Sequence, residues 1–106
     1  MKTITYNKLI RDKIPQIIEK KGSRAIVETL SHEAYKKCLD DKLSEELKEY
    51  VDSDSVEELA DLVEVVYAIL NYKGTDISAF EDIRKQKVIE RGAFDKRLLL
   101  KEVIEE

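Results

Sequence analysis

The sequence predicts an all-α fold, a helical bundle built on an antiparallel helix hairpin. Two long stretches carry apolar residues at helical spacing, and only a short polar break, residues 52–55 (DSDS), separates them. Glycine and proline are scarce, with three and one among 106 residues, as expected for helices rather than many short strands. With 42% hydrophobic and 40% charged residues, the chain is expected to be globular.

At this length we expect a single domain spanning residues 1–106. A chain of about this size buries only about two-thirds of its unfolded surface. Assembly into a homodimer or homotetramer would cover more, so we expect a homo-oligomer.

The leader, residues 1 to about 21, is expected to contain a helix with Pro15 in its first turn, ending at Gly22. Residues 24–30 (RAIVETL) include several β-branched side chains and are expected to be extended. Near the other end, residues 95–101 are expected to form either a short extended segment or a terminal helical turn.

The first long helix is expected to start after Ser31, a favourable N-cap, and to run to about Val51. The last helix is expected to start near Thr75 or Asp76 and to end at Gly92.

The second long helix is expected to end at Gly74. Its start is predicted at a capping box formed by Asp54 and Glu57, three residues apart. Ser55 with Glu58 is the competing box. The choice matters because a box that uses Asp54 and Glu57 leaves the Glu58 carboxylate available.

In the first long helix, two glutamates approach the apolar face. At about 100° per residue, Glu46 falls inside the apolar stripe and Glu49 at its border, while Glu45 points away. The stripe consists of Tyr35, Leu39, Leu43, Leu47 and Tyr50.

The second long helix repeats this phase. Glu58 falls inside the apolar stripe and Asp61 at its border, while Glu57 and Glu64 face outward. The stripe consists of Leu59, Leu62, Val65, Val66 and Ile69. Because the short break implies a tight hairpin, four carboxylates are expected to converge between the two helices.

Clustered carboxylates in an apolar seam need positive charge, since burial and mutual repulsion both oppose ionisation. Lysines or arginines from the leader or the last helix would supply it as ion pairs. Alternatively, the carboxylates bind Mg²⁺, or Mn²⁺, both of which prefer oxygen ligands. Zinc is not favoured, because His32 and Cys38 are the chain's only histidine and cysteine.

The acid pattern resembles a known signature. EExxE at residues 45–49 and EExxD at residues 57–61 are similar to the motif of the all-α nucleoside triphosphate pyrophosphohydrolases, which include MazG-like proteins, dimeric dUTPases and phosphoribosyl-ATP pyrophosphohydrolase. Residues 7–15 (NKLIRDKIP) resemble the NKLVRDKIP leader of small MazG-like proteins. Residues 90–94 (ERGAF) resemble their ERGGF element, with Ala93 in place of the second glycine.

The resemblance implies a Mg²⁺-dependent enzyme that cleaves a nucleoside triphosphate between its α and β phosphates, giving a nucleoside monophosphate and pyrophosphate. It also implies that the metal-binding and catalytic residues are Glu46, Glu49, Glu58 and Asp61. The general base would be one of these acids or Glu45. House-cleaning hydrolysis of standard or damaged nucleotides is the activity this resemblance favours.

Basic residues are expected to bind the substrate phosphates. Residues 1–24 carry seven Lys or Arg against two acids, whereas residues 25–72 carry four against thirteen. Arginine can hold a phosphate in a bidentate way and lysine acts as a point charge. The candidates, in the leader and on the last helix, are Lys8, Arg11, Lys13, Lys87 and Arg91.

Two alternative functions stay open. One is hydrolysis of phosphoribosyl-ATP in histidine biosynthesis, although the leader characteristic of that enzyme is not evident. The other is a non-catalytic helical bundle that binds a nucleotide or a protein.

The composition also bears on location and partners. No apolar stretch approaches the roughly 18 residues of a membrane span, and the acidic middle of the chain does not suit nucleic acid. A single cysteine and a start without an apolar core favour the cytoplasm. His32, Cys38 and the tyrosines are expected to have structural roles.

Overall fold

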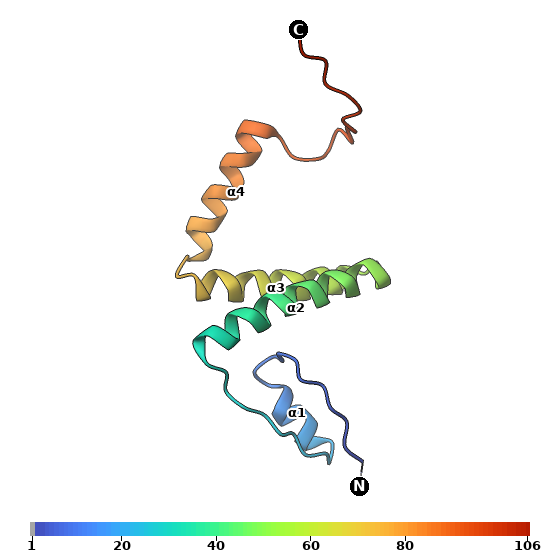
Figure 1. Ribbon diagram of the computed structural model, residues 1–106, viewed down its shortest axis with the longest axis vertical. Helices are drawn as coiled ribbons and strands as arrows, with labels where there is room; N and C mark the ends of the chain where they lie inside the picture. The colour runs from blue at the N-terminus through green and yellow to red at the C-terminus, as the bar shows by residue number, and fades with distance from the viewer. Residues whose placement is uncertain (1) are drawn as a thin grey trace. The chain divides into compact units, whose positions relative to one another are not determined.

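The computed structural model describes residues 2–106 and contains four helices in this part of the chain (Figure 1). They are α1 (Ile14–Lys20), α2 (His32–Ser53), α3 (Val56–Tyr72) and α4 (Ile77–Arg91). No strand occurs among these residues, so the all-α prediction is confirmed. No helix within residues 2–106 is both long enough and apolar enough to cross a bilayer.

The chain divides at Gly74 into two compact units, Met1–Gly74 and Thr75–Glu106, which are described separately. In the first unit, α2 and α3 pack against each other as an antiparallel hairpin (Figure 1). The antiparallel helix hairpin predicted from the two apolar stripes is therefore confirmed.

The short helix α1 forms where the leader predicts it. Pro15 lies at the start of the helix, where its missing N–H costs no hydrogen bond. Gly22, with a φ of +94°, follows the last turn and takes a backbone conformation that other residues adopt at a cost. Residues 24–30 have neither helical nor strand structure.

Helix α2 starts at the predicted cap, because the hydroxyl of Ser31 accepts a hydrogen bond from the N–H of Ala34 at 3.2 Å. The helix continues two residues beyond the expected end at Val51, to Ser53. Asp54 then adopts a left-handed conformation, with a φ of +56°, and ends it.

The capping residue of α3 is Ser55, and the prediction of Asp54 was wrong. The hydroxyl of Ser55 accepts from the backbone N–H of Glu58 at 3.4 Å. Asp54 is unavailable because it already closes α2 in the left-handed conformation. Only one residue thus remains between the turn and α3, which keeps the hairpin tight.

The interface between α2 and α3 is small. Leu39, at 1% exposure, and Val65, at 9%, are the buried apolar residues in the described chain. Glu46, at 6%, is the one buried charged residue among residues 2–106. A carboxylate therefore occupies a place in the seam that would otherwise be filled by an apolar side chain.

Aromatic contacts close the open end of the hairpin, opposite the turn. His32 stacks on Tyr72 with ring centroids 4.3 Å apart, and Tyr35 meets the same ring edge-on at 5.9 Å. These contacts join the start of α2 to the end of α3. They confirm the structural role expected for His32 and for two of the tyrosines.

The apolar stripes are wider than the seam. On both helices, some apolar residues remain exposed. They lie about 100–160° around the helix axis from Glu46 on α2 or from Glu58 on α3. Leu47 and Leu59, expected in the stripe, are 52% and 37% exposed. Their exposed apolar neighbours are Val51, Val56 and Val63. A single partner helix covers only part of each stripe.

The second unit consists of α4 and the tail. The carboxylate of Asp76 accepts from the N–H of Ala79 at 2.8 Å, which confirms the predicted start of the helix. Gly92, with a φ of +81°, ends it as predicted. The N–H of Arg97 donates to the carbonyl oxygen of Phe94 at 3.2 Å and closes one isolated turn, while residues 98–101 form neither a strand nor a helix. Phe94 is almost fully exposed.

Candidate metal centre

The hairpin directs the four predicted acids to different depths. Glu46 on α2 is buried, Glu58 and Asp61 on α3 are half-buried, and Glu49 on α2 is exposed. This order follows the helical phase, which placed Glu46 and Glu58 inside the apolar stripes and the other two acids at the border. The expectation that the acids of the two helices face the seam is confirmed most clearly for Glu46, which is buried.

The carboxylates form two overlapping groups. Oxygens from Glu46, Glu58 and Asp61 all lie within 4.8 Å of one another. A second group, with the same spacing, joins Glu45, Glu46 and Glu49 on α2. Glu46 belongs to both groups and is therefore the central residue of the cluster.

Two oxygens of this cluster are buried and have no hydrogen-bond partner, Oε2 of Glu46 and Oε2 of Glu58. Burial raises the pKa of Glu46, and the nearby charges of Glu49 and Asp61 raise it further. Burial also raises the pKa of Glu58, again with Glu49 and Asp61 adding to the effect. These two carboxylates are poorly compensated by the protein itself.

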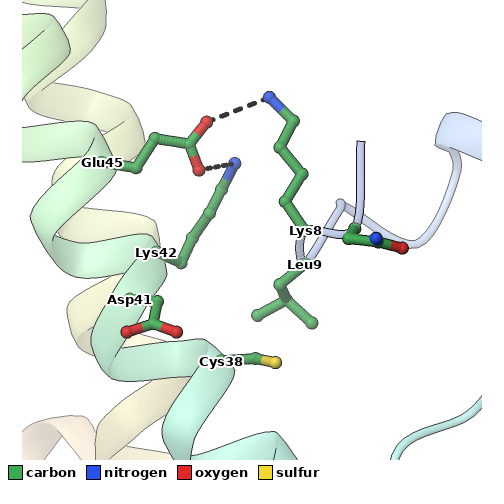
Figure 2. Close-up of a pocket in the computed structure, with 7 residues that line it drawn as sticks. Lys8, Leu9, Cys38, Asp41, Lys42 and Glu45 are labelled. Carbon is green, nitrogen blue, oxygen red and sulfur yellow. Dashed lines mark hydrogen bonds and ion pairs between the residues drawn. The ribbon is translucent and has the colours of Figure 1, made fainter. Parts of the chain in front are cut away.

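Glu45 has a different environment (Figure 2). Its two oxygens accept from Lys8 at 3.0 Å and from Lys42 at 3.2 Å. Partial burial opposes ionisation, but the bonds from the two lysines outweigh it, so the pKa of Glu45 lies below its usual range. The bond to Glu45 likewise raises the pKa of Lys8. Although the phase predicts that Glu45 points outward, the leader covers it.

Two further ion pairs reach the predicted metal ligands. Lys42 lies 3.2 Å from Oε1 of Glu46, and Arg11 of the leader lies 2.7 Å from Oδ1 of Asp61. Each of these cations contacts one oxygen of its carboxylate. In the part of the chain that the structure describes, no ion pair involves Glu49 or Glu58.

The predicted phosphate-binding residues have different surroundings. Lys8 and Arg11 contact acids of the cluster, as described. Lys13 is exposed at the start of α1. Lys87 and Arg91 are exposed on α4, in the second unit.

Lys42 is a functional candidate that the sequence reasoning missed. Only 16% of its side chain is exposed, and it contacts both Glu45 and Glu46. The signal was present, because residues three and four apart on a helix are neighbours. The expected counter-charges were those of the leader and the last helix, whereas Lys42 lies on α2 itself.

The donor set fits a hard divalent cation. It consists of carboxylate oxygens, which Mg²⁺ and Mn²⁺ prefer. Oxygens bound to one Mg²⁺ lie at most about 4.2 Å apart, twice the usual metal–oxygen distance, so a spread of up to 4.8 Å needs a small side-chain adjustment. The two buried oxygens without a hydrogen-bond partner are the positions at which contact with a cation would contribute most.

The pocket beside this cluster is small. It has a volume of about 70 Å³ and is lined by Lys8, Leu9, Cys38, Lys42 and Glu45, with Asn7 and Asp41 (Figure 2). Pockets that enclose a drug-sized ligand measure about 300–1,000 Å³. This pocket is too small for a nucleotide.

Comparison with protein-family models, with curated proteins and with solved structures found no match to this chain.

Proposed function

We propose that the protein is a Mg²⁺-dependent nucleoside triphosphate pyrophosphohydrolase, related to the MazG-like proteins, that cleaves between the α and β phosphates. The products would be a nucleoside monophosphate and pyrophosphate. The observation that carries the proposal is the buried Glu46, whose Oε2 has no partner and which shares a carboxylate cluster with Glu58 and Asp61. The resemblance of residues 7–15, 45–49, 57–61 and 90–94 to that family supplies the reaction.

The acids would have distinct roles in this reaction. Glu46, Glu58 and Asp61 would hold the cation, and the exposed Glu49 would complete the cluster from its rim. Bound Mg²⁺ would supply charge neutralisation along the phosphates and would lower the pKa of an attacking water. The general base would be one of these acids or Glu45; burial and the nearby charges of Glu49 and Asp61 raise the pKa of Glu58, and a raised pKa makes a carboxylate a stronger base.

The leader supplies the first phosphate-binding candidates. The guanidinium of Arg11 and the ammonium of Lys8 reach the acid cluster from a separate segment, and both side chains are about half-exposed. A triphosphate bound at the cluster would therefore contact Arg11 and Lys8 before the other candidates. Arginine is suited to bidentate contact with phosphate. Lys13, Lys87 and Arg91 are the further candidates.

A homodimer or homotetramer is part of the proposal. The pocket beside the cluster does not accommodate a nucleotide, and the hairpin leaves an apolar face that includes Leu47, Val51 and Val63 exposed. A second copy of the chain would cover this face and supply further walls for the base and sugar.

A second candidate is a non-catalytic helical bundle whose acids serve as an ion-pair network. The pairs of Arg11 with Asp61 and of Lys42 with Glu46 favour it, because cations of the protein already contact two of the predicted ligands. Under this hypothesis the protein binds a nucleotide or a protein partner and catalyses no hydrolysis.

Product analysis distinguishes the two. The purified protein is incubated with Mg²⁺ and a panel of standard and damaged nucleoside triphosphates, with phosphoribosyl-ATP included. We expect pyrophosphate rather than orthophosphate from at least one nucleoside triphosphate, and no turnover by Glu58→Gln. Glu64→Gln, an exposed acid on the same helix, is the matched control and should retain activity. No metal-dependent turnover of any substrate would refute the enzymatic proposal, and turnover of phosphoribosyl-ATP alone would change the substrate.

A further inference from the structure

The side chain of Lys42 is largely buried and lines the pocket that α2 forms with residues 7–9 of the leader (Figure 2). It is 16% exposed, and the side chain of Glu46 that it contacts is 8% exposed. A buried ammonium is costly unless hydrogen bonds to acids compensate it. Lys42 donates a hydrogen bond to Oε2 of Glu45 at 3.2 Å and forms an ion pair with Oε1 of Glu46, also at 3.2 Å.

The contact with Glu46 involves one oxygen only. Lys42 holds Oε1, while Oε2 stays buried and has no partner. With one oxygen fixed and the helix backbone fixed, the carboxylate has little freedom to turn the other oxygen away from the cluster. The lysine therefore determines where the free oxygen of Glu46 lies relative to Glu58 and Asp61.

Lys42 is itself fixed by the other side of the cluster. Glu45 accepts from Lys42 through one oxygen and from Lys8 of the leader through the other (Figure 2). Both oxygens of Glu45 are therefore engaged, one by each lysine. A chain of contacts thus runs from Lys8 through Glu45 and Lys42 to Glu46.

We propose that Lys42 is a positioning residue for the cation site: it binds one oxygen of Glu46 and thereby presents the other, together with Glu58 and Asp61, to a divalent cation. Glu45, on this proposal, holds Lys42 rather than the metal. Ligating carboxylates are commonly held by hydrogen bonds of this kind, and loss of the partner typically costs about 10–100-fold in metal affinity. The inference rests on the proposed metal centre.

The proposal predicts whether cation affinity rises or falls when Lys42 is replaced. A lysine near a cation site repels the cation, so simple electrostatics predicts that removing Lys42 strengthens binding. Positioning predicts the opposite. The two effects are separated by Lys37, which lies on the same helix, pairs with Asp41 at 3.1 Å and is 80% exposed. Lys37→Met removes the same charge from α2 without touching the cluster.

The test is titration of the full chain with manganese(II) chloride, followed by isothermal calorimetry and by the electron paramagnetic resonance of free Mn²⁺. We expect Lys42→Met to lose about 10–100-fold in affinity and Lys37→Met to stay within about twofold of the original chain. Lys42→Arg keeps the charge but changes the geometry, and should lose affinity to a smaller extent. Far-UV circular dichroism establishes that each variant is folded.

Binding by folded Lys42→Met that is as tight as in the original chain, or tighter, would overturn the proposal. If Lys42→Met does not fold, Lys42→Arg decides: a loss of several-fold supports positioning, and an unchanged affinity overturns it. If the proposed metal centre does not exist, the result is different. The original chain would then not bind Mn²⁺ at millimolar concentration, and the titration of Glu58→Gln would be the same as that of the original chain.

Discussion

Replacing Glu46 by glutamine is expected to have opposite effects on stability without and with metal. In the metal-free protein the pKa of Glu46 is raised by burial and by Glu49 and Asp61, even though the bond to Lys42 acts in the other direction. The surroundings therefore disfavour the ionised form on balance. Glutamine resembles the protonated form and keeps an oxygen that can accept from Lys42. In EDTA at pH 7, Glu46→Gln should unfold at a higher temperature than the original chain.

The size of the effect follows from the length of the chain. With an unfolding entropy of about 2.1 cal/mol/K per residue, 106 residues give about 220 cal/mol/K, so 1 kcal/mol corresponds to about 4–5 °C. Each unit by which the pKa is raised corresponds to about 1.4 kcal/mol, or about 6 °C. With Mn²⁺ at about 100 times its dissociation constant, the original chain gains about 2.7 kcal/mol, or about 12 °C. The variant, lacking a ligand, should gain little, and the order of melting temperatures reverses.

The pH dependence provides an independent check on the same residue. Because the folded-state pKa of Glu46 lies above its ordinary value of 4.5, the original chain gains stability as the pH falls through the folded-state pKa. This contribution is complete below the unfolded value and is lost at neutral pH. In EDTA the two melting temperatures should therefore converge between pH 7 and about pH 4.5.

Thermal unfolding followed by circular dichroism measures these differences, with the exposed Glu64→Gln as control. A sharp drop in the melting temperature of Glu46→Gln in EDTA would refute the reasoning. It would show that Glu46 stabilises the fold as the partner of Lys42, as the ion-pair hypothesis requires.

Five further substitutions, grouped in three comparisons, test the hairpin and the leader. Leu39→Ala should cost about 3–5 kcal/mol in chemical unfolding, whereas Leu47→Ala, at a half-exposed site, should cost about 1 kcal/mol or less; equal costs would show that a partner buries Leu47. Ser55→Ala should cost about 1 kcal/mol and Asp54→Gly should be neutral or slightly stabilising, and the reverse order would contradict the assignment of the α3 cap. Arg11→Gln should change stability by less than about 1 kcal/mol but lower kcat/KM by about 10–100-fold; unchanged kinetics would remove Arg11 from the phosphate site.

Local signals predicted the helices well, because caps and stops depend on neighbouring residues. Ser31, Asp76, Gly22 and Gly92 all have the roles that sequence indicates. At the turn, the sequence contains two overlapping capping boxes, and the predicted one, Asp54 with Glu57, is not the one that caps α3. Asp54 adopts the left-handed conformation that ends α2, and Ser55 therefore caps α3. The conformation of Asp54 depends on how tightly the hairpin closes.

The helical phase predicted the burial of Glu46, because periodicity alone places it among apolar residues. The same periodicity overstated the burial of Leu47 and Leu59, since phase does not indicate how many neighbouring helices cover a stripe. The partners of Asp61 and Glu45 in the leader lie 50 and 37 residues away in sequence. Such contacts depend on the path of an irregular segment, for which no local pattern exists.

The formal charges of the cluster show how much of its negative charge the protein's own cations neutralise. The cluster contains five carboxylates and three cations of the protein, which leaves two negative charges, the number that one divalent cation neutralises; the cations are Lys8, Arg11 and Lys42. A completed ion-pair network would lower the pKa of every acid in it, as the two lysines lower that of Glu45. The pKa of Glu46 and that of Glu58 are instead raised. The protein's own cations therefore compensate these two buried carboxylates incompletely, since Lys42 contacts only one oxygen of Glu46 and no ion pair among the described residues involves Glu58. A divalent cation would contact the buried oxygens that lack partners and would relieve the repulsion.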